Sequence, residues 1–315
     1  MEITAQANVA TEMGGQYSLG KILGIWVLAA LPMGILSWIV FPALSPDFSS
    51  NPLGAALTRI ALITIGLIWL FVLSMIIVRQ EEGDLRWATI KRRLRLNTPR
   101  HPKSGEPRRK LWLWVIPFLI AITVWEIALV PSVTRLWVST FPFFAEPPGY
   151  SLGAVFESQG TLDRLAGAWW FLGLFVVEAV FNSILGEEFL FRGVLLPKME
   201  GVFGRWSWLA NGMLHGFWHL HQPWGIAGSV VSGAFLYAFP SWRFRSTWLG
   251  IIVHSAQNAY FAFLILGVVL GLALKGRNSS MEDQPELDIQ LLNGTLLSQA
   301  GRVLKLQGKD KEIAK

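Results

Sequence analysis

Three groups of ionisable or amide side chains lie within or beside apolar stretches in the second half of the sequence. In chain order they are Glu187, Glu188 and Arg192, then His215 and His219, then His254 and Asn258. Charged groups in segments long enough to span a bilayer are costly and need partners. We therefore predict that these residues, which are distant in sequence, meet in one place.

The first group has the spacing of a carboxylate site on a helix. Each residue of an α-helix turns by ~100°, so residues four apart share a face. Glu188 and Arg192 have this spacing and can form an ion pair, which leaves Glu187 free for another role. A carboxylate held away from bulk water is suited to act as a general base for a water molecule.

The two later groups, His215/His219 and His254/Asn258, also have residues four apart. Their N–H groups, if directed at a peptide carbonyl, would stabilise the oxyanion of a tetrahedral intermediate. Together with a water-activating carboxylate, this set suits hydrolysis of an amide bond in a membrane cavity. The histidine pair could instead bind zinc, with Glu187 or His254 as a third ligand.

Each group on its own also has a structural explanation. A Glu-Glu pair followed by Arg at a helix end is often only a solvated terminus, and a histidine in an apolar helix usually hydrogen-bonds a neighbouring helix. Four of the five histidines fall between residues 215 and 254, and this conjunction favours a site. Two further acids, Glu126 and Glu178, are predicted to link helices or line a cavity. Glu178 lies nine residues before Glu187 and is expected on the opposite helix face.

The composition is that of a membrane protein. The 315 residues are 52% hydrophobic and 15% charged, with a mean hydropathy of +0.44, which predicts an all-α polytopic membrane helix bundle. The absence of cysteine excludes disulfides, Cys-ligated zinc and a thiolate nucleophile. Residues 79–110 hold eleven Lys/Arg and four Asp/Glu, or 11 − 4 = +7. We interpret this loop as a topology signal that touches anionic lipid, not as a nucleic-acid patch.

Seven apolar segments are predicted to span the membrane, or eight if the last is divided. They run from about Lys21 to Pro42, Leu57 to Val78, Leu111 to Val133, Leu165 to Leu190, Trp206 to Leu220, Gly225 to Phe239 and Thr247 to Leu274. The fifth and sixth are short. In the sixth, Gly228, Ser232 and Gly233 are expected to let helices approach closely.

The segments divide the chain into four parts. These are a polar N-terminal segment (1–20), three spans with the basic loop (21–164), a catalytic membrane core (165–274) and a polar tail (275–315). Residues 134–163 are expected to form an irregular link. A second basic link is predicted from Arg192, Lys198 and Arg205. Basic links are usually cytoplasmic, which would put the active-site end near the cytoplasmic face.

In this order the polar groups resemble the three motifs of the CPBP intramembrane proteases, also called the ABI family, which include the type II CAAX prenyl endopeptidases. The motifs are Glu187-Glu188-x-x-x-Arg192, His219 within Met213–His219, and His254-x-x-x-Asn258. The stretch from Phe189 to Pro197 also resembles the continuation of the first motif. The resemblance covers about residues 165–265.

The resemblance implies a glutamate-dependent, metal-free endopeptidase of peptide or lipidated-protein substrates. It implies the following roles: Glu187 activates water, Glu188 and Arg192 support it, His219 assists at the water or carbonyl, and His254 with Asn258 forms the oxyanion site. One position departs from the family, because Phe usually stands where His215 stands here. We interpret His215 as an accessory group that either hydrogen-bonds in the cavity or restores metal binding with His219.

Other functions fit the same residues. The chain could be a non-proteolytic membrane scaffold, a transporter-like protein or a bacteriocin-immunity protein. Glu178, Asn182, Glu187 and Glu188 on one helix could form a cation or proton path. Neither the substrate, its prenylation, nor the oligomeric state can be inferred from the sequence.

Overall fold

The computed structural model describes residues 15–153, 156 and 159–272 of the chain. These residues form a helical bundle without named strands, apart from one isolated bridge between Arg100 and Pro107. The predicted all-α polytopic membrane bundle is confirmed. The predicted tail (275–315) and residues 1–14 lie outside the described residues.

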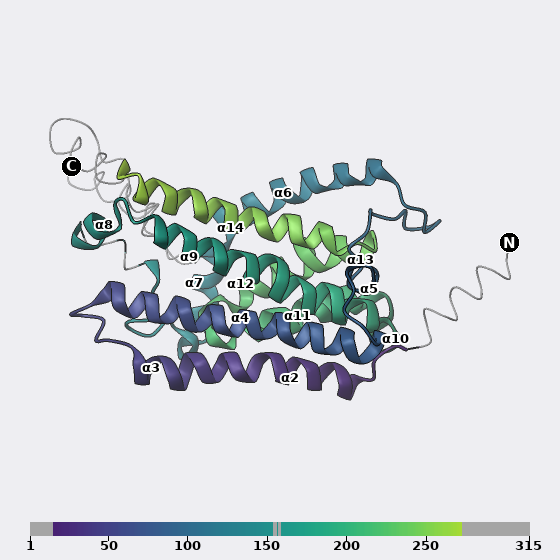
Figure 1. Ribbon diagram of the computed structural model, residues 1–315, viewed down its shortest axis with the longest axis horizontal. Helices are drawn as coiled ribbons and strands as arrows, with labels where there is room; N and C mark the ends of the chain where they lie inside the picture. The colour runs from purple at the N-terminus through teal and green to yellow at the C-terminus, as the bar shows by residue number, and fades with distance from the viewer. Residues whose placement is uncertain (1–14, 154–155, 157–158, 273–315) are drawn as a thin grey trace, which may run out of the picture.

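Five of the described helical runs are long and apolar enough to cross a membrane. They correspond to the first four and the last of the predicted segments, and α2, α4, α9 and α14 run along the long axis of the molecule (Figure 1). The runs are α2 (Leu19–Ile35) through α3 (Phe41–Leu44); α4 (Pro52–Glu82); η2 (Arg109–Trp114), α6 (Val115–Val124), η3 (Trp125–Leu129) and α7 (Val130–Thr140); α9 (Trp169–Val180), η6 (Phe181–Gly186), η7 (Glu188–Leu195) and η8 (Leu196–Lys198); and α14 (Thr247–Val269).

The fifth and sixth predicted segments form a closely packed pair of short helices. They are α11 (Ser207–Trp218) with η10 (His219–His221), and α12 (Ile226–Val231) with η12 (Ser232–Ala238) and α13 (Phe239–Arg243). A methyl group added at Gly212 would collide with Ala234, and one at Gly216 with Val230. The 12 residues of α11 rise by only about 18 Å, so the count of seven spans stays a prediction.

The predicted close approach in the sixth segment is correct at one glycine and wrong at another. A methyl group at Gly233 would meet the His215 ring, whereas at Gly228 the nearest atom, on Val130, lies 3.8 Å away. The tightest approaches come instead from α11, because Gly212 and Gly216 face the α12–η12 run. In the sequence, Gly212 and Gly216 of the fifth segment therefore indicated close helix packing better than the glycines of the sixth segment did.

Three basic links lie at one end of the bundle: residues 79–110, the link that contains Lys198 and Arg205, and a third that contains Arg243 and Arg245. In Figure 1, α5 (Trp87–Arg93), α10 (Glu200–Phe203) and α13 gather at the end opposite α3 and α8 (Gln159–Leu165). The Asn97 amide donates to the Arg245 carbonyl oxygen at 3.1 Å, which joins the first link to the third. This arrangement agrees with the predicted alternation of basic links, while the side of the membrane that they face stays a prediction.

The fourth span differs from its predicted form in two ways. It continues to Lys198 rather than ending near Leu190, and Arg192 is buried inside it instead of belonging to a basic link. The span can keep Arg192 buried because its guanidinium pairs with Glu188 on the same helix and donates to the Gly233 carbonyl oxygen on η12. Upstream, α7 continues to Thr140, so the irregular link predicted from residue 134 begins later.

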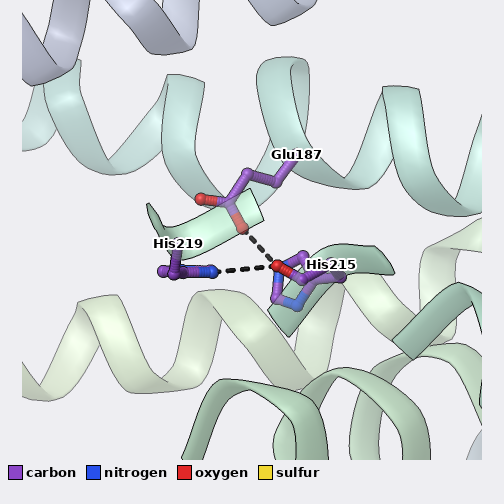
Figure 2. A group of neighbouring side chains, drawn as sticks. All are labelled: Glu187, His215 and His219. Atoms are coloured by element: carbon purple, nitrogen blue, oxygen red, sulfur yellow. Dashed lines mark hydrogen bonds and ion pairs between the residues drawn. The ribbon is translucent and has the colours of Figure 1, made fainter. Parts of the chain in front are cut away.

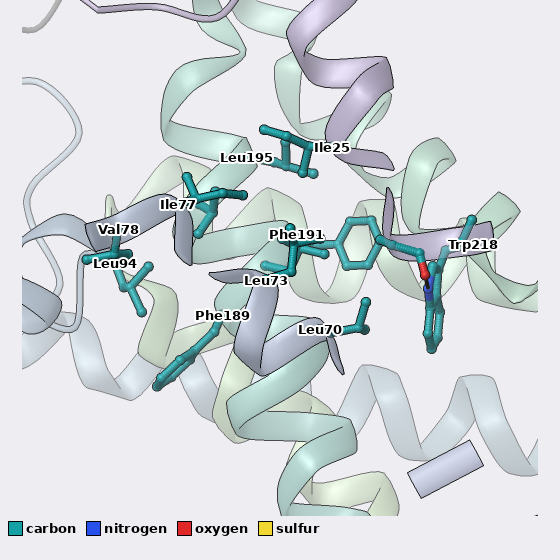
Figure 3. Packing of buried hydrophobic residues seen from close by; sticks show 14 of the residues in the cluster. Ile25, Leu70, Leu73, Ile77, Val78, Leu94, Phe189, Phe191, Leu195 and Trp218 are labelled. Atoms are coloured by element: carbon teal, nitrogen blue, oxygen red, sulfur yellow. Dashed lines mark hydrogen bonds between the residues drawn. The ribbon is translucent and has the colours of Figure 1, made fainter. Parts of the chain in front are cut away.

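The motif helix packs on a hydrophobic core that α2 and α4 provide. Figure 3 shows the cluster, to which η7 contributes Phe189, Phe191 and Leu195 and the neighbouring helices contribute Ile25, Leu70, Leu73 and Ile77. One residue of the basic loop, Arg93, is also buried here, while Arg86 and Arg92 are exposed, and the loop's contact with lipid stays a prediction. Arg93 donates to the carbonyl oxygens of Gly193 (3.1 Å) and Val194 (3.3 Å) and pairs with Glu81 at 2.8 Å.

Candidate active site

Glu187 lies between the π-helical segments η6 and η7, where its side chain is 1% exposed. Its Oε2 atom is 2.6 Å from Nε2 of His215 on α11, and the two side chains point toward one another in Figure 2. The Nδ1 atom of His219 lies 3.0 Å from the His215 carbonyl oxygen. The imidazole that contacts the carboxylate is therefore that of His215, which sequence analysis treated as accessory.

Glu188 faces a different set of partners. Its Oε1 atom lies 3.2 Å from Nη1 of Arg192 and 3.1 Å from Nδ1 of His254, so the predicted ion pair is present. Arg192 also donates to the Gly233 carbonyl oxygen at 3.0 Å. A methyl group at Gly250 would collide with Glu188 Oε2, so α14 can approach this carboxylate only with glycine there.

The Glu187 side of the motif opens into a cavity of about 210 Å³. Its lining brings together five of the predicted site residues, namely Glu187, His215, His219, His254 and Asn258. Glu188 and Arg192 are not part of the lining and lie behind His254. The two adjacent carboxylates therefore occupy different environments: Glu187 borders the cavity, and Glu188 is enclosed in protein. Neither belongs to a solvated helix end.

Glu178 also lines this cavity, which corrects its predicted place on the opposite face of the helix. The prediction assumed α-helical geometry between Glu178 and Glu187. Residues Phe181–Gly186 are π-helical, and each residue of a π-helix turns through a smaller angle than in an α-helix. The wider turns bring both acids toward one face. The predicted cavity-lining role is correct for Glu178 and for Glu126.

An amide chain joins Glu178 to the third motif. The Asn182 amide group is 3.5 Å from Glu178 Oε1, and the Asn258 amide group donates to Asn182 Oδ1 at 3.2 Å. Since an amide nitrogen carries two hydrogens, this bond leaves Asn258 one N–H for another acceptor.

Two other residues of the site were missed by sequence analysis. The Tyr237 ring stacks on His254 with centroids 4.5 Å apart and fixes one face of the imidazole. Nothing in the local sequence distinguishes Tyr237 from an interface aromatic. Arg59 lines the far part of the cavity. As a charge within an apolar segment, it carried a signal that could have found it.

A comparison with known proteins identifies a family that is similar to part of this chain. Residues 166–260 match the family model described as "Type II CAAX prenyl endopeptidase Rce1-like". This region belongs to the CAAX protease family. The resemblance inferred from the three motifs is thereby confirmed, and the matched region contains all seven predicted site residues. No curated protein and no solved structure matches the chain.

The family match and the apolar helices together support two general conclusions, one about the class of protein and one about its substrate. The apolar helices make the chain an integral membrane protein, and the family that matches residues 166–260 is a protease family. The family also implies a lipidated or prenylated peptide substrate within a membrane. The roles of individual residues need a separate argument from the geometry.

The environment of His254 restricts the hydrogen bonds that this side chain can make. An ionised Glu188 accepts a hydrogen bond from Nδ1–H, so neutral His254 keeps a lone pair on Nε2. His254 can donate to an oxyanion from Nε2 only as an imidazolium, which a neighbouring carboxylate stabilises. Glu188 therefore sets the tautomer of His254.

The residues around Glu187 could also hold a metal ion. One ligand atom from each of Glu187, His215 and His219 lies within 4.8 Å of the others. Two ligands of one tetrahedral zinc lie about 3.3 Å apart, whereas the Glu187–His215 contact is a direct hydrogen bond of 2.6 Å. A metal bound by all three residues would have to replace this hydrogen bond, and the absence of a metal stays a prediction.

Proposed function

We propose that the protein is an intramembrane endopeptidase in which Glu187 activates the attacking water. The observation that carries the proposal is the buried Glu187–His215 hydrogen bond at a cavity that His254 and Asn258 also line. The bond engages Oε2, while Oε1 makes no hydrogen bond with the described residues. A carboxylate fixed through one oxygen can accept a proton at the other.

In the proposed reaction, Glu187 takes a proton from water while the water oxygen attacks the peptide carbonyl carbon. The negative charge that develops on the carbonyl oxygen is stabilised by His254 as imidazolium and by the remaining N–H of Asn258. Collapse of the intermediate breaks the C–N bond, and the leaving amine takes the proton from Glu187. Glu188 and Arg192 act as positioning residues, because Glu188 contacts His254, Arg192 pairs with Glu188, and neither lines the cavity.

The proposed substrate is a prenylated or otherwise lipidated peptide. This class follows from the family that matches residues 166–260, and the apolar outer surface of the long helices suits delivery through the bilayer. We also propose that the end with the basic links faces the cytoplasm, which would place the site near that leaflet.

The test is cleavage of an internally quenched farnesylated peptide by the full chain in proteoliposomes. Replacing Glu187 with Gln keeps the side-chain shape and removes the base, so we expect kcat/KM to fall by about 10²- to 10⁴-fold with normal membrane insertion. Glu200→Gln is the matched control, because Glu200 lies at the surface end of the same motif region and, among the described residues, bonds only Trp242. Full activity in Glu187→Gln would refute the proposal.

The same preparations separate the other functions. A transporter would show altered proton or cation flux in Glu187→Gln without a cleavage defect, and a scaffold would show neither effect. A zinc-dependent version of the protease is tested by elemental analysis of the wild type and of His215→Phe. Stoichiometric zinc that is lost in the variant, together with inhibition by chelators, would replace the glutamate mechanism with a metal-dependent one.

A further inference from the structure

Glu178 is an acid of the cavity wall that the proposed reaction does not use. It lies on α9, nine residues before Glu187, and lines the same cavity. Its Oε1 atom is 3.5 Å from the amide nitrogen of Asn182, one helical turn later. Acids inside membrane spans are costly and often functional, so its place beside the candidate base calls for a role.

Asn182 is joined to both halves of the site. Its backbone carbonyl oxygen accepts a hydrogen bond from the backbone N–H of Glu187, which closes a wide turn of the π-helical segment η6. Its side-chain oxygen accepts from the amide group of Asn258 on α14 at 3.2 Å. Single π turns inside α-helices are frequent at functional sites. Asn182 thus lies between the carboxylate proposed to activate water and the amide proposed to face the oxyanion.

The carboxylate of Glu178 gives this chain of hydrogen bonds one direction. A side-chain amide has donors on its nitrogen and an acceptor on its oxygen, whereas a carboxylate can only accept. Glu178 therefore turns the nitrogen of Asn182 toward itself, which leaves the Asn182 oxygen directed at Asn258. Asn258 must then present its nitrogen to Asn182, and this fixes the direction of its second N–H. The contact of 3.5 Å is long, as contacts in catalytic sites often are before substrate binds.

We propose that Glu178 and Asn182 are positioning residues that hold the amide of Asn258 with one N–H directed at the oxyanion. The inference rests on the proposed function, in which Asn258 is one of the oxyanion donors. Such a donor is effective when it is already oriented before charge develops, because no free energy is then spent on turning it. An amide without a fixed partner can present its oxygen instead, which would repel the oxyanion. The chain that starts at Glu178 removes this second orientation.

The same contacts could serve only to hold η6 against α14, and a matched control for this alternative lies next to Asn182. The hydroxyl groups of Ser183 and Ser255 are 3.1 Å apart and join the same two helices. Ser183 is not part of the cavity lining. The variant Ser183→Ala therefore removes a polar contact between these helices without touching Asn258.

The first experiment measures kcat and KM separately for a farnesylated peptide in proteoliposomes. Asn182→Leu removes the acceptor for Asn258, and we expect kcat to fall roughly 10- to 100-fold, less than for direct loss of an oxyanion donor. KM should stay near the wild-type value, because the oxyanion exists only after the water has attacked. Ser183→Ala should keep the wild-type kcat even if its unfolding temperature falls. Full kcat in Asn182→Leu would overturn the inference and leave the proposed function in place.

The second experiment exchanges the acid and the amide. In the double variant Glu178→Gln/Asn182→Asp, the new amide can donate to the new carboxylate, which still accepts from Asn258. Each single substitution disturbs the chain, because Glu178→Gln allows it to reverse and Asn182→Asp places two carboxylates together. We therefore expect kcat of the double variant to exceed that of both single variants. A kcat equal to the product of the two single losses, as for independent sites, would overturn the inference.

The third experiment separates the inference from the proposed function, because it needs no cleavage. The probes are a peptide phosphonate, whose anionic oxygen takes the place of the oxyanion, and the matching peptide amide. Both are titrated into the purified full chain with Glu187→Gln and followed by Trp fluorescence. Analogues of the transition state bind more tightly than substrates, so the phosphonate should be favoured by about tenfold or more. This preference should approach one when Asn182→Leu is added and persist when Ser183→Ala is added.

The outcomes assign each failure to one proposal. A wild type that leaves the farnesylated peptide intact, together with a phosphonate preference that depends on Asn182, would refute the proposed function and support the positioning role. Equal binding of the phosphonate and the amide would overturn the positioning role of Glu178 and Asn182.

Discussion

Two buried arginines of this protein, Arg192 and Arg59, differ in their ion pairing and in their position relative to the cavity. Both lie in long apolar helices and are almost inaccessible, at 1% and 3% exposed. Arg192 contacts Glu188 and the Gly233 carbonyl and faces away from the cavity. Arg59 lines the cavity and forms no ion pair with the described residues. The two side chains share other features, because both guanidinium groups lie beside aromatic rings and the Nε and Nη1 atoms of both have no hydrogen-bond partner among the described residues.

The contrast teaches how to interpret a buried charge in a membrane protein. A guanidinium whose charge is balanced inside the fold holds other groups in place, as Arg192 holds Glu188 against His254. One that lines a cavity and forms no ion pair can be reached by a ligand. The predictions below test this distinction, because the two arginines should differ in what their removal changes.

The largest effect is expected for Arg192→Met. The substitution leaves the enclosed Glu188 without its cation, and breaking a buried pair from one side costs about 3–5 kcal/mol. We expect a large fall in the unfolding temperature in detergent and loss of cleavage. The double variant Glu188→Gln/Arg192→Met should recover much of the thermal stability, because no unpaired charge remains. Equal stability of the single and double variants would contradict the pairing.

A smaller effect is expected for Arg93→Met, which removes the donors to the Gly193 and Val194 carbonyl oxygens and the partner of Glu81. Loss of buried hydrogen bonds costs about 1–3 kcal/mol, so the melting temperature should fall less than for Arg192→Met. Arg92→Met is the matched control, because Arg92 pairs with Glu82 at the surface. An unchanged melting temperature in Arg93→Met would show that the basic loop does not support the motif helix.

For Arg59→Met we expect little change in stability, below about 1 kcal/mol, since replacing a buried charge without close ion-pair partners is often neutral or stabilising. Its measured consequence should be a change in the KM of cleavage, because Arg59 lines the cavity. Thermal melts of Arg59→Met and Arg192→Met under one condition compare the two arginines directly. Similar destabilisation of both variants would remove the distinction between them.

The smallest predicted effect is a change in ligand binding at Arg59 with pH. Burial raises the pKa of Glu146 to about 7, although the Arg59 charge opposes the shift. Above this pH the Glu146 carboxylate is ionised and competes with an incoming anion for Arg59, beside Tyr150 and His221; below it Glu146 is neutral. Binding of butyrate, a small anionic probe, to the purified full chain should therefore strengthen by a few-fold from pH 8 to pH 6. A titration of Glu146→Gln should remove this dependence, and an unchanged slope would assign it to another group.

Much of the fold was predictable because its signals are local. Apolar runs of bilayer length predicted the five long helical runs to within a few residues at most ends, and the basic links predicted which ends lie together. The motif spacing predicted the Glu188–Arg192 pair, since four-residue spacing on a helix depends only on nearby residues. The cost of polar groups in apolar segments predicted that Glu187, His219, His254 and Asn258 lie together.

The tertiary structure decided which groups face one another. Sequence periodicity assumes α-helical turns, and π-helical segments on both sides of Glu187 changed the faces that its helix presents. Packing of α11 against η12 selected His215 rather than His219 as the direct partner of Glu187. The distance from Arg59 to Glu187 depends on α4 lying against a helix more than 100 residues later in the chain. Local sequence sets the chemical groups, but only long-range packing sets the distances at which charges and donors meet.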